Sequence, residues 1–296
     1  MASQRDVKNK IASVKNIQKI TRAMEMVAGA RLRRAEQRIE ALRPYAEAIG
    51  RMTRQAAAAA GSEAAQLPLL REHPTPQRVG LLLVTGDRGL AGGFNSQIIR
   101  AGLRLSAELA EDALTTEWYA TGRRGVSSLS FRGHELRGSY TGFADRPAYA
   151  DARTIAEDLI AAYVDERLDR VEMVFNSYVS PLTQRVTRQR LLPLSHEALG
   201  EDSEQTEAPA HASVDYEPDP EMILRRLVPD YIEISIYRAL VESAAGFFGA
   251  QMTAMRSASE NAGEIITDYT LQMNRARQAE ITQEIMEVVA GAEGLS

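Results

Sequence analysis

Proline is almost absent from the two ends of this 296-residue chain, and this distribution constrains the fold more than any other feature. Ten of the eleven prolines lie between Pro68 and Pro229, and the remaining one is Pro44. Because proline removes a backbone donor and clashes inside a helix, both ends of the chain can form long helices. Pro44 is expected to mark a kink or a helix end.

Apolar residues in both arms recur at spacings of three and four, which is typical of a coiled coil. In the N-terminal arm, residues 1–60, the stripe comprises Ile17, Ile20, Met24, Ala28, Leu32, Ala35, Ile39, Leu42 and Ala46. In the C-terminal arm, residues 221–296, it comprises Phe248, Met252, Met255, Ser259, Ala262, Ile266, Tyr269, Met273 and Ala276, and then shifts to Ile281, Ile285 and Val288. A helix over residues 231–290 would be roughly 90 Å long. Such a narrow stripe needs a partner, so we predict that the two arms pack as antiparallel helices.

The middle of the chain, residues 61–220, has the pattern of an α/β body. Strands are expected at 78–85, 117–120, 136–140, 171–179 and 186–192, and helices at 95–112, 123–131 and 151–168. This alternation favours a Rossmann-like βαβ body with a mainly parallel sheet. The acidic, proline-containing segment 195–220 reads as an exposed loop.

Composition excludes several classes of function. The absence of cysteine rules out disulfides, thiol catalysis and thiolate metal sites. No apolar run approaches the ~20 residues of a membrane span, and no secretory signal is evident at the N-terminus. The net charge of −5 is uneven, because residues 1–54 hold 13 basic and 5 acidic side chains whereas residues 221–296 hold 6 and 11. The two arms could attract each other, or each could attract another partner.

The glycine-rich turn Thr85–Asn95 follows a strand and precedes a helix, where backbone amides can bind phosphate. It matches neither the dinucleotide fingerprint nor the P-loop, so a structural or partner-contacting turn is favoured. The four histidines lack metal-ligand spacing and are expected to be solvated. No constellation of residues indicates catalysis, and neither a metal nor a cofactor is expected.

Four arginines, Arg31, Arg33, Arg34 and Arg38, could bind nucleic acid, because releasing counterions from phosphates favours such a stripe. The first 44 residues contain no aromatic side chain for base stacking, and the chain is acidic overall. A solvated or ion-paired helix face is therefore favoured. A nucleotide-dependent α/β enzyme and a basic-helix nucleic-acid binder remain alternative functions.

Four segments resemble the gamma subunit of F-type ATP synthase, and they occur in the order found in that family. They are Lys10–Ala28 (KIASVKNIQKITRAMEMVA), Asp87–Asn95 (DRGLAGGFN), Asp215–Pro220 (DYEPDP) and Asn274–Ile285 (NRARQAEITQEI), and Arg43-Pro44-Tyr45 also fits. The similarity spans both arms and the body.

The resemblance implies a bacterial central rotor shaft, which is a non-catalytic subunit. An antiparallel coiled coil would stand inside a hexamer of alpha and beta subunits, and the Rossmann-like body would bind the epsilon subunit and the ring of c subunits. The shaft would couple proton flow through the ring to catalysis on the beta subunits. It would sit peripherally at the cytoplasmic face of the bacterial plasma membrane, without nucleic acid as a partner.

The resemblance also assigns contact residues. Arg22 and Met24 would face the beta-subunit lever, and Asp87 and Arg88 would lie near it. The beta loops that catch the shaft would meet Arg277, Gln278, Thr282 and Glu284. Tyr216 and Glu217 would lie near the c ring.

The chain departs from the family at two places. Where relatives commonly read SEHAARM, this chain reads GFFGAQM over Gly246–Met252, so an acid and an arginine are lost and apolar packing by Phe247 and Phe248 is expected instead. Many relatives carry cysteine at the position of Ala91, and its absence here removes the thiol regulation of plastid relatives.

Overall fold

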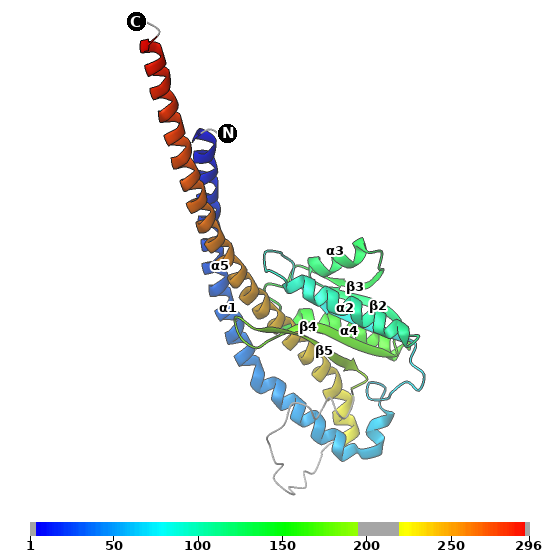
Figure 1. Cartoon of the computed structure of the whole chain (residues 1–296). Coiled ribbons are helices and arrows are strands. Elements are labelled where there is room, and N and C mark those ends of the chain that lie inside the picture. The colour runs from blue at the N-terminus through cyan, green and yellow to red at the C-terminus, as the bar shows by residue number, and fades with distance from the viewer. Residues whose placement is uncertain (1–3, 195–218, 294–296) are drawn as a thin grey trace. The chain divides into compact units, whose positions relative to one another are not determined.

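The computed structural model describes residues 4–194 and 219–293 (Figure 1). In chain order the elements are α1 (Gln4–Ala60), η1 (Gly61–Gln66), β1 (Arg78–Val84), α2 (Phe94–Glu111), β2 (Thr115–Thr121), α3 (Arg123–Phe131), β3 (Leu136–Tyr140), α4 (Tyr149–Val164), β4 (Arg170–Tyr178), β5 (Gln184–Leu192) and α5 (Pro220–Glu293). In the part of the chain that the structure describes, no helix is both long enough and apolar enough to cross a membrane.

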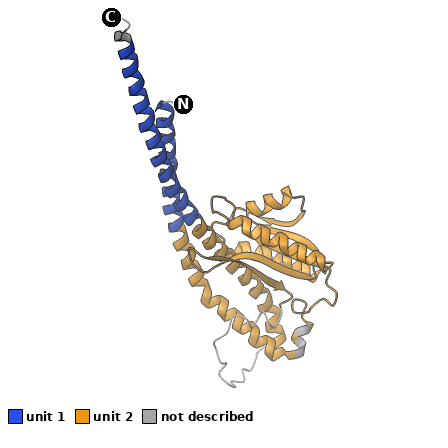
Figure 2. Cartoon of the chain, viewed as in Figure 1, with its two compact units in different colours: residues 1–29, 251–296 blue, residues 30–250 orange. Residues whose placement is uncertain are grey.

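The described chain divides into two compact units, which Figure 2 colours separately. Unit 1 comprises residues 1–29 and 251–296, and unit 2 comprises residues 30–250. Each long helix therefore contributes to both units.

The sheet of unit 2 confirms the predicted mainly parallel α/β body. Its strand order is β3-β2-β1-β4-β5; the first four strands are parallel and β5 is antiparallel to β4. The central strand β1 is the apolar run after Arg78, and its residues from Val79 to Val84 are all buried. A strand covered on both faces must be apolar on both, which explains why β1 shows no alternation.

Both faces of the sheet are covered by helices. On one face, α4 packs with segments of α1 and α5, and the shared core includes Leu82, Ile155, Leu159 and Ile236. On the other face lies α2, where Gly102 permits close contact: a Cβ there would lie 2.4 Å from the side chain of Leu83. The alternation of strands and helices thus produces a doubly wound body, in which successive strands are added on one side of β1 up to β3 and on its other side from β4 onward.

One predicted helix end is wrong, and for Pro44, expected at a kink or a helix end, the second alternative is excluded. Helix α4 ends at Val164 rather than at 168, because Glu166 adopts a positive φ of 55° and the amides of Arg167 and Leu168 bond back to the carbonyl of Ala162. Pro44 does not end α1, which continues to Ala60. Its side chain is exposed, so the backbone carbonyl that loses its helical donor there can be hydrated.

In unit 1, α1 and α5 pack antiparallel, as predicted. The amide of Gln18 donates to the carbonyl of Ser259 at 3.1 Å, and nearer the C-terminal end of α1 the Glu25 carboxylate pairs with Arg256 at 2.9 Å. Lys10 lies 5.8 Å from the ring centre of Tyr269. Residue numbers of the contacting pairs therefore decrease along α1 as they increase along α5, which is the register of an antiparallel pair.

The predicted α5 seam is confirmed as far as Ala276, whereas the α1 seam is wrong at its start. Met255 and Ala262 are buried, but Ile17 and Ile20 are 53% and 59% exposed. The α1 side chains that face α5 there are instead Val7, Ile11, Val14, Gln18 and Thr21, and the seam joins the predicted stripe at Ala28. Polar Gln18 and Thr21 enter the seam because backbone carbonyls accept their hydrogen bonds, which an apolar pattern cannot anticipate.

Candidate functional site

The glycine-rich turn after β1 is anchored to the neighbouring strand. The Thr85 hydroxyl donates to the carbonyl of Thr121 at 2.7 Å and accepts from the amide of Gly125 at 2.9 Å. Gly86 donates to the Asn95 side chain at 2.8 Å, and that side chain donates to the carbonyl of Arg88 at 3.0 Å. The turn is thus held at both ends.

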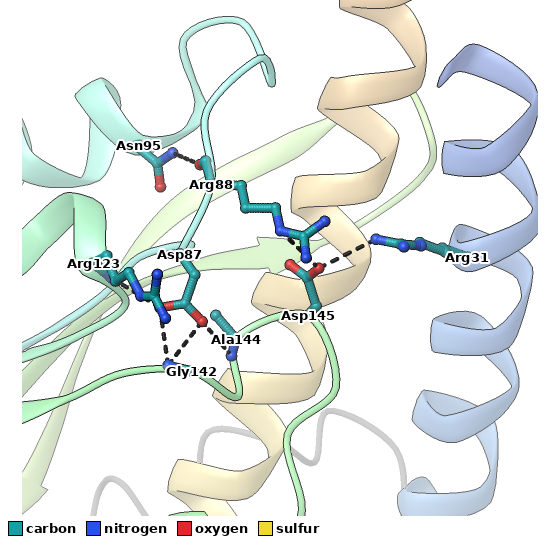
Figure 3. Close-up of polar contacts among 8 residues, drawn as sticks. All are labelled: Arg31, Asp87, Arg88, Asn95, Arg123, Gly142, Ala144 and Asp145. Atoms are coloured by element: carbon teal, nitrogen blue, oxygen red, sulfur yellow. Dashed lines mark hydrogen bonds and ion pairs between the residues drawn. The ribbon is translucent and has the colours of Figure 1, made fainter. Parts of the chain in front are cut away.

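Asp87 links three segments of unit 2 through hydrogen bonds. Its carboxylate accepts hydrogen bonds from the amides of Arg123, Gly142 and Ala144, at 3.0–3.1 Å (Figure 3). These amides belong to the start of α3 and to the connection between β3 and α4. The carboxylate therefore has a structural role within the chain.

Replacing Asp87 with alanine is expected to destabilise unit 2 by about 2–4 kcal/mol, because hydrogen bonds to a charged acceptor are worth about 1.5–3 kcal/mol and three donors lose their partner. Urea unfolding of the purified chain measures this cost. As a control, Asp151→Ala removes a carboxylate that accepts from one amide only, that of Ala148, and it should cost about 1 kcal/mol. Equal losses in the two variants would contradict the anchoring role.

The adjacent Arg88 joins a second group of charges. Its guanidinium lies 3.6 Å from the carboxylate of Asp145, which also pairs with Arg31 of α1 at 3.2 Å (Figure 3). Arg31 in turn lies over the ring of Phe248, 5.7 Å from its centre. Sequence reasoning missed Asp145, since nothing in a sequence signals that it lies beside Arg31, 114 residues away. Arg88 remains 66% exposed and Leu90 is 65% exposed, so both can reach a partner.

Residues of α5 fill the crevice where doubly wound folds bind nucleotides, beyond the carboxyl ends of β1 and β4. Phe247 packs so closely on Gly86 that a Cβ there would lie 3.0 Å from the ring, and the Ser243 hydroxyl accepts from the amide of Asn176. The cavity left there measures about 10 Å³, which is room for about one water molecule. This packing leaves no room for a nucleotide.

The expected apolar packing at the Gly246–Met252 departure is confirmed. Phe247 and Phe248 are buried, and Phe247 meets the ring of Phe94 edge-on at 5.6 Å. Gly246 and Gly249 allow the close approach, because a Cβ on Gly249 would lie 2.8 Å from the carbonyl oxygen of Pro181.

In unit 1, the assigned α1 residues lie on the surface. Arg22 is exposed and Met24 is half-buried. Ile17, Ile20 and Val27 are exposed and, with Met24, recur at spacings of three and four, so they form one stripe outside the seam. Ile17 and Ile20, which sequence analysis placed in the seam, thus belong to an outward-facing surface.

The assigned α5 residues lie beyond the seam. Arg277, Gln278, Thr282 and Glu284 are all exposed, and by the register of the pair Gln4, the first described residue of α1, falls opposite Arg277. Roughly 27 Å of helix separates Arg277 from the part of α5 that faces Arg22. The two groups of assigned residues are therefore separate surfaces.

Other assignments have different outcomes. Tyr216 and Glu217 lie outside the described residues.

The expectation that the histidines are solvated is wrong for His73, which packs edge-on against Tyr163 with ring centres 5.2 Å apart, and for His134, which lies beside Trp118. Both imidazoles are partly covered because their apolar ring faces pack on aromatic neighbours. Among the described residues, no cluster of His, Asp and Glu could hold a metal ion.

Comparisons with known proteins account for this architecture. The family model described as ATP synthase matches residues 3–295. The ATP synthase gamma chain of Rubrobacter xylanophilus is 43% identical over all of this chain and 99% of that protein, and the gamma chain of Desulfitobacterium hafniense is 40% identical over the full length of both.

Solved structures agree with the sequence relatives. A chain of the central stalk and c-ring of Tetrahymena thermophila mitochondrial ATP synthase is 26% identical, covers 81% of this chain and 99% of its own length, and has a TM-score of 0.60. A chain of the Euglena gracilis mitochondrial ATP synthase shares the fold at 14% identity with a TM-score of 0.67, covering 99% and 94%. Because the family model and the curated relatives match the chain from end to end, this chain belongs to the ATP synthase gamma chain family.

Proposed function

We infer that this chain is the central-stalk subunit of a bacterial F1 sector and acts as its rotor shaft. The observation that carries this inference is the full-length match to gamma chains, together with an antiparallel helix pair whose outer surface carries exposed apolar side chains such as Ile20 and exposed charged side chains such as Arg22. The subunit is non-catalytic, and the filled crevice at Gly86 and Phe247 supports that role.

In this proposal, the helix pair of unit 1 stands within a hexamer of alpha and beta subunits, and unit 2 binds the epsilon subunit and the c ring. The complex is membrane-associated, with this chain peripheral at the cytoplasmic face. A shaft that turns inside a hexamer must present different side chains at different angles, so that each beta subunit is biased toward a different conformation. The uneven surface of unit 1 suits this role, because it combines an exposed apolar stripe with exposed charged side chains such as Arg22.

The two surfaces divide the contacts. Arg22 and Met24, with the exposed stripe around Ile20, meet the beta lever, while Arg277, Gln278, Thr282 and Glu284 meet the catch loops. In the glycine-rich turn, Arg88 provides the contact near the lever and Asp87 holds the turn in shape. The division into arms 1–60 and 221–296 and a body 61–220 stays a prediction, as does contact of Tyr216 and Glu217 with the c ring.

Reconstitution tests the proposed function. The purified chain is mixed with alpha and beta subunits from the same source, and the mass of the complex and its ATP hydrolysis are compared with those of alpha plus beta alone. We expect one copy per hexamer and a changed turnover. Failure to form a complex would contradict the proposal.

Met24→Lys tests the contact with the beta lever. A cation at this position should form charge contacts worth about 1–4 kcal/mol that change with shaft angle, and proton pumping per ATP hydrolysed should fall in membrane vesicles. Met52→Lys is the matched control, because it makes the same substitution at another methionine of α1, which is 49% exposed and belongs to none of the assigned contacts. An unchanged pumping ratio in Met24→Lys, or an equal fall in both variants, would contradict the assigned contact.

A further inference from the structure

A second cavity of unit 2 lies away from the surfaces discussed so far. It occupies about 500 Å³ beside the outer strands β2 and β3 and the C-terminal half of α4. This volume is within the range of small-molecule sites. Arg78, Arg137 and Arg167 line it with Tyr119, and its other polar lining residues are Glu117, Tyr140 and Asp158. We call it the β2–β3 groove.

Inside the groove, each of the two carboxylates already accepts a hydrogen bond from a neighbouring side chain. The Asp158 carboxylate accepts from the Tyr140 hydroxyl at 2.7 Å, and the Glu117 carboxylate accepts from Arg137 Nε at 2.6 Å. The carboxylates that flank the groove are also occupied: Asp165 pairs with Arg167, and Asp169 accepts from the amides of Gln77 and Arg78.

Some donor atoms of the groove, in contrast, have no partner among the described residues, although Arg78 pairs with Asp169 at 3.8 Å through another guanidinium nitrogen. The Tyr119 side chain belongs to a residue that is only 5% exposed, and no described residue forms a hydrogen bond with its hydroxyl. Arg78 Nε is buried and also lacks a partner among the described residues. Arg167 uses one guanidinium nitrogen for Asp165 and has further N–H groups available. A buried donor without an acceptor, such as Arg78 Nε, is rare in native proteins and indicates that something else supplies the acceptor, whereas the Tyr119 hydroxyl lines the groove and can donate to a bound group.

The Tyr119 hydroxyl remains protonated at neutral pH. Burial raises the pKa of Tyr119, and the nearby positive charge of Arg167 opposes this effect without reversing it. A neutral phenol beside a guanidinium offers two donors and one positive charge. This combination is complementary to an oxyanion, since charge-assisted hydrogen bonds are stronger than neutral ones.

We propose that the β2–β3 groove is a binding site for a small oxyanion, a phosphate or a carboxylate, whose oxygens accept hydrogen bonds from Tyr119 and Arg167. Arg78 adds a further cation and donor at the start of β1. The site is separate from the glycine-rich turn, which follows the opposite end of β1. The proposal is independent of the rotor function, because no groove residue belongs to the assigned partner contacts.

Calorimetric titration of the full-length chain at low salt tests the proposal, with pyrophosphate and citrate as probes. Binding of pyrophosphate alone identifies a phosphate site, and binding of citrate alone identifies a carboxylate site. Binding of both identifies a site that recognises negative charge without distinguishing the two groups. We expect Tyr119→Phe and Arg167→Gln each to weaken binding by roughly tenfold or more. Tyr149→Phe and Arg153→Gln are matched controls on α4, because their side chains pair with Glu233 and Glu157 outside the groove.

Arginine labelling provides a readout in the unmodified chain, should a variant fail to fold. A bound probe should protect Arg167 from butanedione, as seen by peptide mass spectrometry, and should leave Arg153 reactive. No heat from either probe at millimolar concentration would overturn the proposal. Equal affinity in groove and control variants, or equal protection of Arg167 and Arg153, would overturn it as well.

Discussion

Gly122→Ala is expected to destabilise the chain by more than about 4 kcal/mol, a loss in the range of the most severe single substitutions. Gly122 precedes α3 with φ of 82°, and a Cβ there would lie 2.2 Å from the carbonyl oxygen of Thr85. That oxygen belongs to backbone rather than to a flexible side chain, so β1 or α3 must move. Either shift disrupts the Thr85 and Asp87 hydrogen bonds that hold the glycine-rich turn.

Gly133→Ala separates steric conflict from backbone strain. Gly133 has nearly the same φ, 81°, but nothing lies within 4 Å of its added Cβ. The free energy of unfolding of this variant should fall only by the cost of a left-handed conformation for alanine, about 1–2 kcal/mol. Urea unfolding followed by circular dichroism measures both losses. If the two variants lose equal stability, steric conflict with the Thr85 carbonyl does not contribute to the loss in Gly122→Ala.

Glu172→Gln is expected to cost about 3–5 kcal/mol, the penalty for removing one partner of a buried ion pair. Glu172 is 1% exposed on β4 and binds two arginines: Arg188 with both carboxylate oxygens, and Arg170 at 3.0 Å. Burial lowers the pKa of the Arg170 guanidinium, and the charge of Glu172 opposes that shift. Without the carboxylate, a largely buried cation remains uncompensated.

Two further variants make this prediction specific. Glu157→Gln breaks an exposed pair with Arg153 and should cost about 0.5 kcal/mol or less. Adding Arg170→Met to Glu172→Gln removes the stranded cation and should recover part of the loss, as a double-mutant cycle would show. A loss in Glu172→Gln as small as that in Glu157→Gln would show that the pair contributes little.

The body of the protein was largely predictable because its signals are local. The apolar run of β1, the periodic helix near Ile155 and the turn at Gly86 are each readable within about ten residues. The parallel pairing of β1 to β4 follows from the alternation of strands and helices, since parallel strands need a crossover connection, which is usually a helix. The end of α4 was missed because a positive φ at Glu166 carries no strong sequence signal.

The candidate sites were less predictable because they depend on contacts between distant segments. The resemblance to gamma subunits identified Asp87 and Arg88, but only the structure shows Asp87 bonded to three backbone amides and Arg88 beside Asp145. The β2–β3 groove collects side chains from three strands and a helix, and no motif records that arrangement.

The sequence by itself determined the class of fold, the two long helices, the α5 seam and membership of the gamma family, because periodicity and long matched segments are properties of the chain. Only the tertiary structure decided which α1 side chains face α5, since Gln18 and Thr21 become acceptable in a seam once backbone carbonyls satisfy them. It also decided that Ile17 and Ile20 face outward and that Phe247 fills the nucleotide crevice. Burial depends on which surfaces meet, and segments far apart in the sequence supply those surfaces.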